Sequence, residues 1–126
     1  MGTALAVAAG GASGALVRWW MAAWVARMVG SQFPFGTLAV NVVGGLAMGV
    51  VTALAGHIWQ MPPILRTFLT VGVLGGFTTF SAFSLEMASM LERGQTVAAM
   101  AYAIASVALS VLALQAGMAV VRNLPA

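Results

Sequence analysis

The residues of this chain that could do chemistry are mostly neutral, and they concentrate between residues 69 and 86. Its middle, residues 75–84, holds two adjacent glycines and four hydroxyl side chains: Gly75, Gly76, Thr78, Thr79, Ser81 and Ser84. Glycine weakens a helix by about 1 kcal/mol per residue, and hydroxyls can bond to backbone carbonyls in place of the helical ladder. We therefore expect the helix to break near residues 75 to 79, where freed carbonyls could coordinate a cation. The alternative is a continuous helix whose Thr and Ser side chains bond back to the preceding turn.

Two further series of polar groups recur every four residues, as groups on one face of a helix do. Thr37 and Asn41 form the first series, and Tyr102, Ser106 and Ser110 form the second. An amide in an apolar environment is costly unless it is paired, so Asn41 stands out. One alternative is that Asn41 makes a bond between helices, worth about 0.6 kcal/mol in membranes. Together the series suggest a narrow path lined by neutral donors, which favours an anion over a cation.

Two aromatic residues and a few charged residues complete the candidate set. Phe80 and Phe83 lie three apart, and the positive edge of an aromatic ring can face a small anion, although core packing is the commoner role of such rings. Arg18 precedes Arg27 by roughly 13 Å of helix, so it could lie below the membrane interface. There its charge could raise the anion concentration at a pore mouth, or its side chain could extend to the lipid headgroups. Glu86 closes the polar stretch, and its position allows pairing with an arginine or relay of a proton.

The composition identifies a membrane protein and excludes several classes of function. Of 126 residues, 62% are hydrophobic and 6% are charged, whereas about a quarter of the residues of a soluble domain carry charge. The net charge of +3 comes from five dispersed arginines and two glutamates, so there is no basic patch for nucleic acid. The chain has no cysteine and one histidine, His57, which argues against thiolate or zinc chemistry. We expect no enzymatic activity.

Turn residues between the apolar intervals divide the chain into helices. We predict an all-α membrane protein, a single integral domain over residues 1–126. Its four transmembrane helices are expected near residues 4–27, 34–55, 63–91 and 96–121. The N-terminal stretch lacks the positive region of a signal peptide, so we expect it to be retained as the first helix. Four helices bury little against each other, so an oligomer is expected.

Three of the predicted helices carry glycines spaced four apart: Gly10 with Gly14, Gly45 with Gly49, and Gly72 with Gly76. In lipid such pairs let backbones approach closely. We interpret each pair as ordinary helix packing.

The arginines predict how the chain inserts. Four helices place both termini on one side, so Arg66 and Arg122 belong to that side and Arg27 and Arg93 to the opposite side. The tie of two against two predicts that the chain can insert in both orientations and pair with an inverted copy of itself. The alternative is that Arg18, His57 or the N-terminal amine selects one orientation.

Three segments of the sequence carry a resemblance to a known family. They are the run Gly75-Gly-Phe-Thr-Thr-Phe-Ser-Ala-Phe-Ser-Leu-Glu86, the run Phe35-Gly-Thr-Leu-Ala-Val-Asn-Val-Val-Gly44, and Gly-x-x-Gly-Ala-x-x-Arg-Trp in the first helix. The chain resembles the Fluc (CrcB) family of bacterial fluoride channels. The resemblance covers essentially the whole chain, and the first run is the most specific part of it.

The resemblance implies a dual-topology homodimer, antiparallel in the bacterial cytoplasmic (inner) membrane, where each chain crosses the lipid several times. It implies two fluoride pores at the subunit interfaces and passive export of fluoride. It also implies a structural sodium ion on the two-fold axis, held by the backbone oxygens of Gly75 and Thr78 of both copies. Independently of the resemblance, the position of Arg18 in the first helix suggests the pore vestibule for this residue. The fluoride pathway would comprise Asn41, Phe80, Phe83, Thr79, Ser81, Ser84, Tyr102, Ser106 and Ser110.

Two rival functions remain at this point. A small dual-topology drug exporter matches in length and helix count, but it requires a membrane-embedded glutamate in the first helix. Residues 1–27 contain neither Glu nor Asp. An assembly subunit that conducts nothing would leave the hydroxyls of the third helix unexplained.

Overall fold

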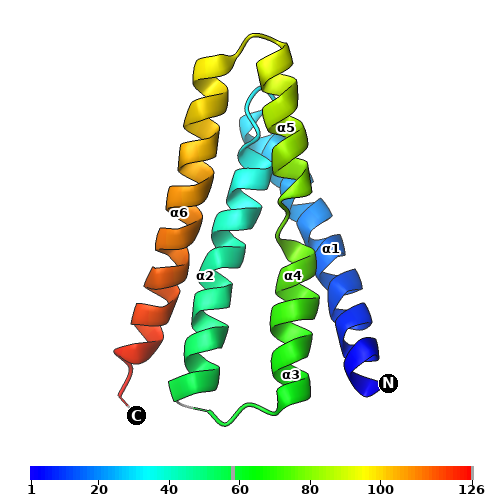
Figure 1. The fold of residues 1–126 in the computed structure, drawn as a ribbon, viewed down its shortest axis with the longest axis vertical. Helices are drawn as coiled ribbons and strands as arrows, with labels where there is room; N and C mark the ends of the chain where they lie inside the picture. The colour runs from blue at the N-terminus through cyan, green and yellow to red at the C-terminus, as the bar shows by residue number, and fades with distance from the viewer. Residues whose placement is uncertain (58, 126) are drawn as a thin grey trace.

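The computed structural model describes residues 1–57 and 59–125, and within these residues the chain is helical and contains no strand. Four helical segments follow one another, and the third is composite (Figure 1). They are α1 (Gly2–Val29), α2 (Phe35–His57), the composite segment, and α6 (Thr96–Arg122). The composite segment consists of α3 (Pro63–Thr67), the π-helical η1 (Phe68–Leu74), α4 (Gly75–Phe77) and α5 (Ser81–Glu92). The outer limits of the four segments lie within two residues of those predicted.

Three of the segments are long and apolar enough to cross a membrane: Phe35–His57, Pro63–Glu92 and Thr96–Arg122. With 28 residues, α1 is also long enough, because a helix rises about 1.5 Å per residue. Arg18 and the small residues Gly10, Gly11 and Ser13 lower its hydropathy. The protein is therefore a multi-pass membrane protein.

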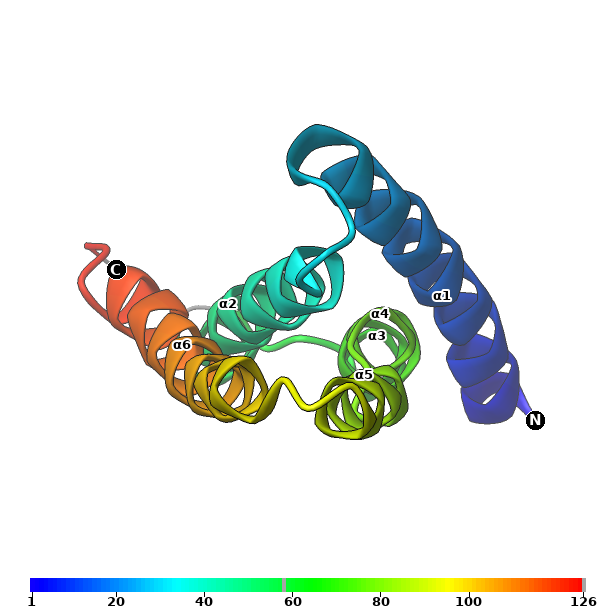
Figure 2. The same cartoon turned by 90° about the horizontal axis from the view of Figure 1, so that it is seen from above.

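The helices form an open arrangement. Seen from above, α2 and the composite segment lie between α6 on one side and the tilted α1 on the other (Figure 2). α6 packs mainly on α2, and α1 packs on η1, α4 and α2. α1 and α6 thus form the two flanks of the molecule, and no other described helix of the chain covers their outer faces in this view.

The predicted glycine pairs lie at these helix contacts. A Cβ added to Gly10 would lie 2.7 Å from the Phe68 carbonyl oxygen and 2.9 Å from the Gly72 Cα. A Cβ on Gly45 would lie 2.6 Å from the Ser110 carbonyl oxygen, so α2 and α6 also approach closely through glycine. The glycines therefore pack helices within one chain, as the sequence interpretation held.

Only a small core is buried. Met90, Ala99 and Tyr102 are at most 1% exposed, and Phe33 and Phe83 pack against them. Many large apolar side chains are exposed, among them Trp19 at 70% and Phe80 at 78%. An apolar surface of this extent requires lipid or another protein chain to cover it.

Four of the five arginines divide evenly between the two ends of the molecule. Both termini and the turn between α2 and α3 lie at one end, whereas the α1–α2 and α5–α6 turns lie at the other (Figure 1). Arg66 and Arg122 belong to the first end, and Arg27 and Arg93 belong to the second. The spatial arrangement has the same two-against-two division that the sequence predicted.

Candidate functional site

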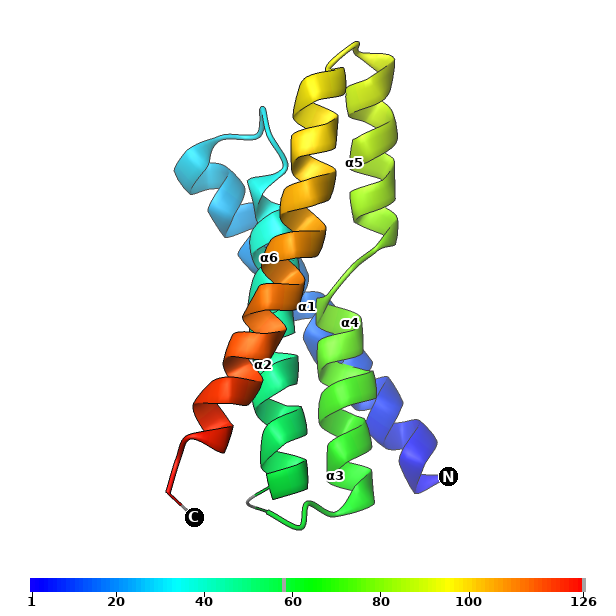
Figure 3. The same cartoon turned by 60° about the vertical axis from the view of Figure 1, so that its left-hand side comes forward.

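The composite third segment loses its helical backbone at residues 78–80. α4 ends at Phe77, Thr78 is extended with φ −81° and ψ 156°, and α5 begins at Ser81. The link between α4 and α5 is visible in Figure 3 as a straight connection between two coils.

The position of this interruption corrects the sequence expectation of residues 75 to 79. Gly75 is helical, with φ −63° and ψ −39°, and Gly76 and Phe77 continue the helix. Gly76 lies against α1, where a Cβ would come within 2.6 Å of the Gly11 carbonyl oxygen. Gly76 therefore serves close packing, and the interruption begins only where Thr78 becomes extended.

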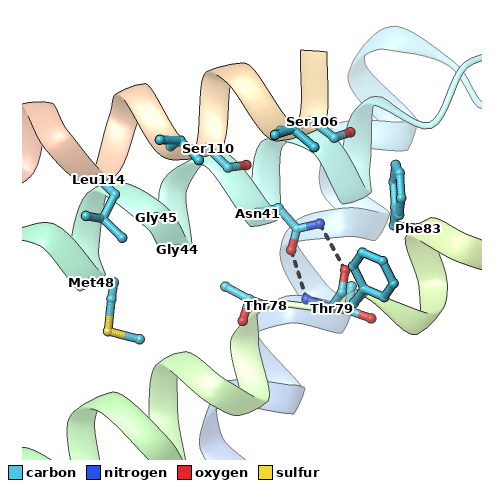
Figure 4. A pocket seen from close by; sticks show the side chains of 13 residues that line it. Asn41, Gly44, Gly45, Met48, Thr78, Thr79, Phe83, Ser106, Ser110 and Leu114 are labelled. Atoms are coloured by element: carbon cyan, nitrogen blue, oxygen red, sulfur yellow. Dashed lines mark hydrogen bonds between the residues drawn. The ribbon is translucent and has the colours of Figure 1, made fainter. Parts of the chain in front are cut away.

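Asn41 of α2 bonds to the non-helical backbone. Its Nδ2 donates to the Thr79 carbonyl at 3.0 Å, and the Thr79 amide donates to Asn41 Oδ1 at 2.8 Å (Figure 4). The side-chain amide thereby satisfies both backbone groups of Thr79, which lies outside the helices. An amide nitrogen carries two hydrogens, so one N–H of Asn41 remains for another acceptor.

Two backbone carbonyls are released by the same arrangement. In a continuous helix the Gly75 carbonyl would accept from the Thr79 amide, which here donates to Asn41. The Thr78 carbonyl would accept from the Ala82 amide, which here donates to Thr79 Oγ1 at 3.2 Å. These carbonyls are the oxygens that the resemblance assigns to sodium.

A pocket of about 390 Å³ lies beside Asn41, between α2, α6 and the α4–α5 link. It brings together six of the predicted pathway residues: Asn41, Thr79, Phe80, Phe83, Ser106 and Ser110. They come from α2, α5, α6 and the α4–α5 link, and Thr78, two glycines and apolar side chains line the rest of the pocket (Figure 4). None of the described residues that line it is ionisable, so any ion inside must be held by neutral groups.

Two hydroxyls that line this pocket lack partners. Ser106 Oγ and Ser110 Oγ are buried, and neither has a hydrogen-bond partner in the described part of the chain. A buried polar group without a partner costs about 1–3 kcal/mol. Both donors are therefore available to a ligand.

The two phenylalanines lie at the same pocket with their ring centroids 5.5 Å apart. Phe83 is partly buried, and its ring meets Tyr102 edge-on with centroids 5.1 Å apart. Phe80 projects from the chain and is 78% exposed. On its outer side the ring therefore has no packing partner among the described residues of one chain.

Tyr102 and Glu86 do not line this pocket. Tyr102 is fully buried and donates to Glu86 Oε2 at 2.5 Å, while Thr37 Oγ1 donates to Glu86 Oε1 at 2.7 Å. The sequence had allowed Glu86 either an arginine partner or a role in proton relay, and the structure places these two hydroxyls on its carboxylate. The spacing of Thr37 and Asn41 had indicated a shared face, but nothing in the sequence pointed to Glu86 as the partner of Thr37.

The remaining predicted residues either line a second pocket or bond to the backbone of their own helix. Arg18, Thr79 and Ser81 line a neighbouring pocket of about 560 Å³ between α1, α2 and α5. Because Thr79 lines both pockets, the two meet at the non-helical link. Ser84 Oγ donates to the Phe80 carbonyl at 3.0 Å, so its hydroxyl is bonded to its own helix.

Comparison with known proteins gives a consistent result over nearly the whole chain. The family model described as CrcB-like protein, Camphor Resistance (CrcB), matches residues 5–118. A Rhodospirillum centenum protein named fluoride-specific ion channel FluC is 52% identical over 119 residues, which is 94% of each chain. A protein of the same name from Rhizobium leguminosarum bv. trifolii is 51% identical over 121 residues, covering 96% of this chain and 97% of the relative. Fluoride-specific ion channel FluC 1 of Nitrobacter hamburgensis is 48% identical over 120 residues, or 95% of each.

Proposed function

The chain belongs to the CrcB-like family, and from this premise we propose that it forms a fluoride-selective anion channel. The channel exports fluoride passively across the bacterial cytoplasmic membrane and lowers its concentration in the cell. The observation that carries the proposal is the pocket at the α4–α5 link, where two buried hydroxyls have no partner and no ionisable side chain is present.

The donors of this pocket suit a small anion that holds water tightly. A selective pore must replace that water with hydrogen-bond donors, yet bind weakly enough for the ion to leave. Ser106 and Ser110 supply O–H groups, and Asn41 supplies its second N–H. The edges of Phe80 and Phe83 add the positive part of the ring quadrupole. Thr79, Ser81 and Arg18 continue the path through the second pocket, where Arg18 raises the local anion concentration.

Passive conduction is sufficient for export. Hydrogen fluoride is a weak acid that crosses membranes when neutral and ionises at cytoplasmic pH, which traps fluoride inside. A membrane potential that is negative inside drives an anion outward at about 2.3 kcal/mol per 100 mV. The family conducts ions and does not catalyse a reaction, so no nucleotide site is required.

The channel is proposed to be a homodimer of two copies with opposite orientations. The even division of arginines between the ends supports insertion in both directions. The exposed Phe80 ring and the uncovered flanks supply surface for a second copy, with lipid around the rest.

A structural sodium ion is proposed at the centre of the dimer. The Gly75 and Thr78 carbonyls fit this ion, because a hard cation prefers oxygen ligands and neither carbonyl is bonded to its helical amide. Gly75 is exposed in the single chain, which leaves room for a second copy to complete the site. The ion would supply a fixed positive charge that binds two copies together.

The proposal is tested by efflux from liposomes that contain the purified protein and are loaded with potassium fluoride or potassium chloride. Addition of a potassium ionophore should release fluoride rapidly while chloride stays inside. Phe80→Ile and Phe83→Ile should each suppress fluoride release while leaving a dimer on size-exclusion chromatography. Equal release of both ions would refute selectivity. A folded dimer that releases neither ion would identify an assembly protein.

A further inference from the structure

Hydrogen bonds of Thr79 keep the backbone before and after this residue from forming an α-helix. The Thr79 amide donates to Asn41 Oδ1, and the Thr79 hydroxyl accepts from the Ala82 amide. The Thr79 carbonyl accepts from Asn41 Nδ2. Amide, carbonyl and hydroxyl of Thr79 are all engaged, and none of these bonds belongs to a helical ladder.

Without these bonds the helix has little to prevent it from continuing. Gly75, Gly76 and Phe77 are already helical, and the Thr78 amide still donates to the Leu74 carbonyl at 3.0 Å. If Thr78 took helical dihedral angles, the next amides would reach the carbonyls one turn earlier. The Gly75 carbonyl would then receive the Thr79 amide, and the Thr78 carbonyl would receive the Ala82 amide.

We propose that Asn41 and Thr79 are positioning residues that keep the Gly75 and Thr78 carbonyls free of helical hydrogen bonds and so available to the sodium ion. Asn41 acts on the Gly75 carbonyl because it takes up the Thr79 amide. Thr79 acts on the Thr78 carbonyl because its hydroxyl takes up the Ala82 amide. The inference rests on the proposed sodium site, and it assigns affinity for that ion to two side chains that do not touch it.

The same two residues line the anion pocket, so one set of hydrogen bonds serves both ions. Asn41 holds Thr79 with one N–H and retains the other for the anion. The anion pocket and the cation site are therefore two sides of a single non-helical link, and a change at Asn41 should alter both.

The test is a sodium titration of the purified dimer without fluoride, with N-methylglucamine replacing sodium at constant ionic strength. Thermal stability of the dimer reports sodium affinity, because a ligand that binds the folded state raises the unfolding temperature. Asn41→Ala should return one carbonyl to its helical donor, and Thr79→Val should return the other. A net hydrogen bond changes an equilibrium by about fivefold, so each variant should raise the sodium dissociation constant about fivefold. The double variant should raise it by less than the roughly 25-fold product, because Asn41 and Thr79 belong to one hydrogen-bond network and their effects are not additive.

Matched variants separate positioning from general damage. Thr79→Ser keeps the hydroxyl and should bind sodium like the parent. Ser106→Ala and Ser110→Ala alter the same pocket without touching the link, and should leave sodium affinity unchanged while lowering fluoride flux. If Asn41→Ala yields no folded dimer, Thr79→Val against Thr79→Ser tests the Thr78 carbonyl alone. Unchanged sodium affinity in Thr79→Val would overturn the inference. If the unfolding temperature of the parent protein does not change with sodium concentration, the sodium site itself is refuted.

Discussion

The packing of α1 against η1 can be tested by adding one methyl group at adjacent positions. At Gly10 a new Cβ would lie 2.7 Å from the Phe68 carbonyl oxygen and 2.9 Å from the Gly72 Cα, whereas at Gly11 it would meet nothing within 4 Å. Both residues lie inside α1, so replacement by alanine favours the helix by about 1 kcal/mol in each case. That contribution cancels when the two variants are compared.

The difference between Gly10→Ala and Gly11→Ala should therefore equal the cost of overpacking, about 1–3 kcal/mol. We expect the upper part of that range, because the obstructing atoms at Gly10 are backbone and cannot rotate away. Gly11→Ala should be slightly more stable than the parent, and Gly10→Ala should be less stable by up to about 2 kcal/mol after the helix gain is subtracted.

The measurement is the free energy of unfolding in mixed micelles titrated with a denaturing detergent, with circular dichroism as the signal. Fluoride efflux should follow the same order, because α1 also supports α4, which leads into the non-helical link. Equal unfolding free energies for the two variants would refute the close contact between α1 and η1. A loss confined to Gly11→Ala would place a second chain, and not η1, at the sensitive face.

Two further predictions concern the polar groups. Ser106→Ala and Ser110→Ala should each lower fluoride efflux severalfold. The free energy of unfolding should stay equal or rise by up to about 1 kcal/mol, because each variant removes a buried hydroxyl that has no partner among the described residues. A fall in the free energy of unfolding would assign these hydroxyls to packing. Tyr102→Phe should lower the free energy of unfolding by about 1–3 kcal/mol because Glu86 loses a donor, and a double-mutant cycle with Glu86→Gln should give less than additive losses. Strict additivity would show that the two side chains are not coupled.

The sequence predicted the four helical segments because turn residues separate apolar stretches of spanning length. The structure also gathers six of the candidate residues at one pocket, and spacing by four, which places polar groups on one helix face, had selected three of them. Asn41, Ser106 and Ser110 were recognised in this way before any partner was known. Local pattern was sufficient here because each series lies on a single helix.

Contacts between helices could not be predicted in the same way. The bond from Thr37 to Glu86 joins residues 49 positions apart, and no spacing rule relates them. The bonds between Asn41 and Thr79 likewise depend on how α2 lies against the link. The expected interruption was placed too early because the glycine pair suggested unwinding, whereas Gly76 packs against α1. Composition reveals that small residues are present, but only the packing decides whether they unwind a helix or admit a neighbour.

Because η1 is π-helical, the number of residues between η1 and the α4–α5 link is fixed by the structure. A wider helix accommodates more residues over the same rise than an α-helix does. Thr79 follows Gly72, which is seated on α1, by seven residues. Deleting one residue between them would rotate everything beyond by about 100° and turn Thr79 away from Asn41. Insertions and deletions should thus be rare here during evolution, even where individual side chains are free to change.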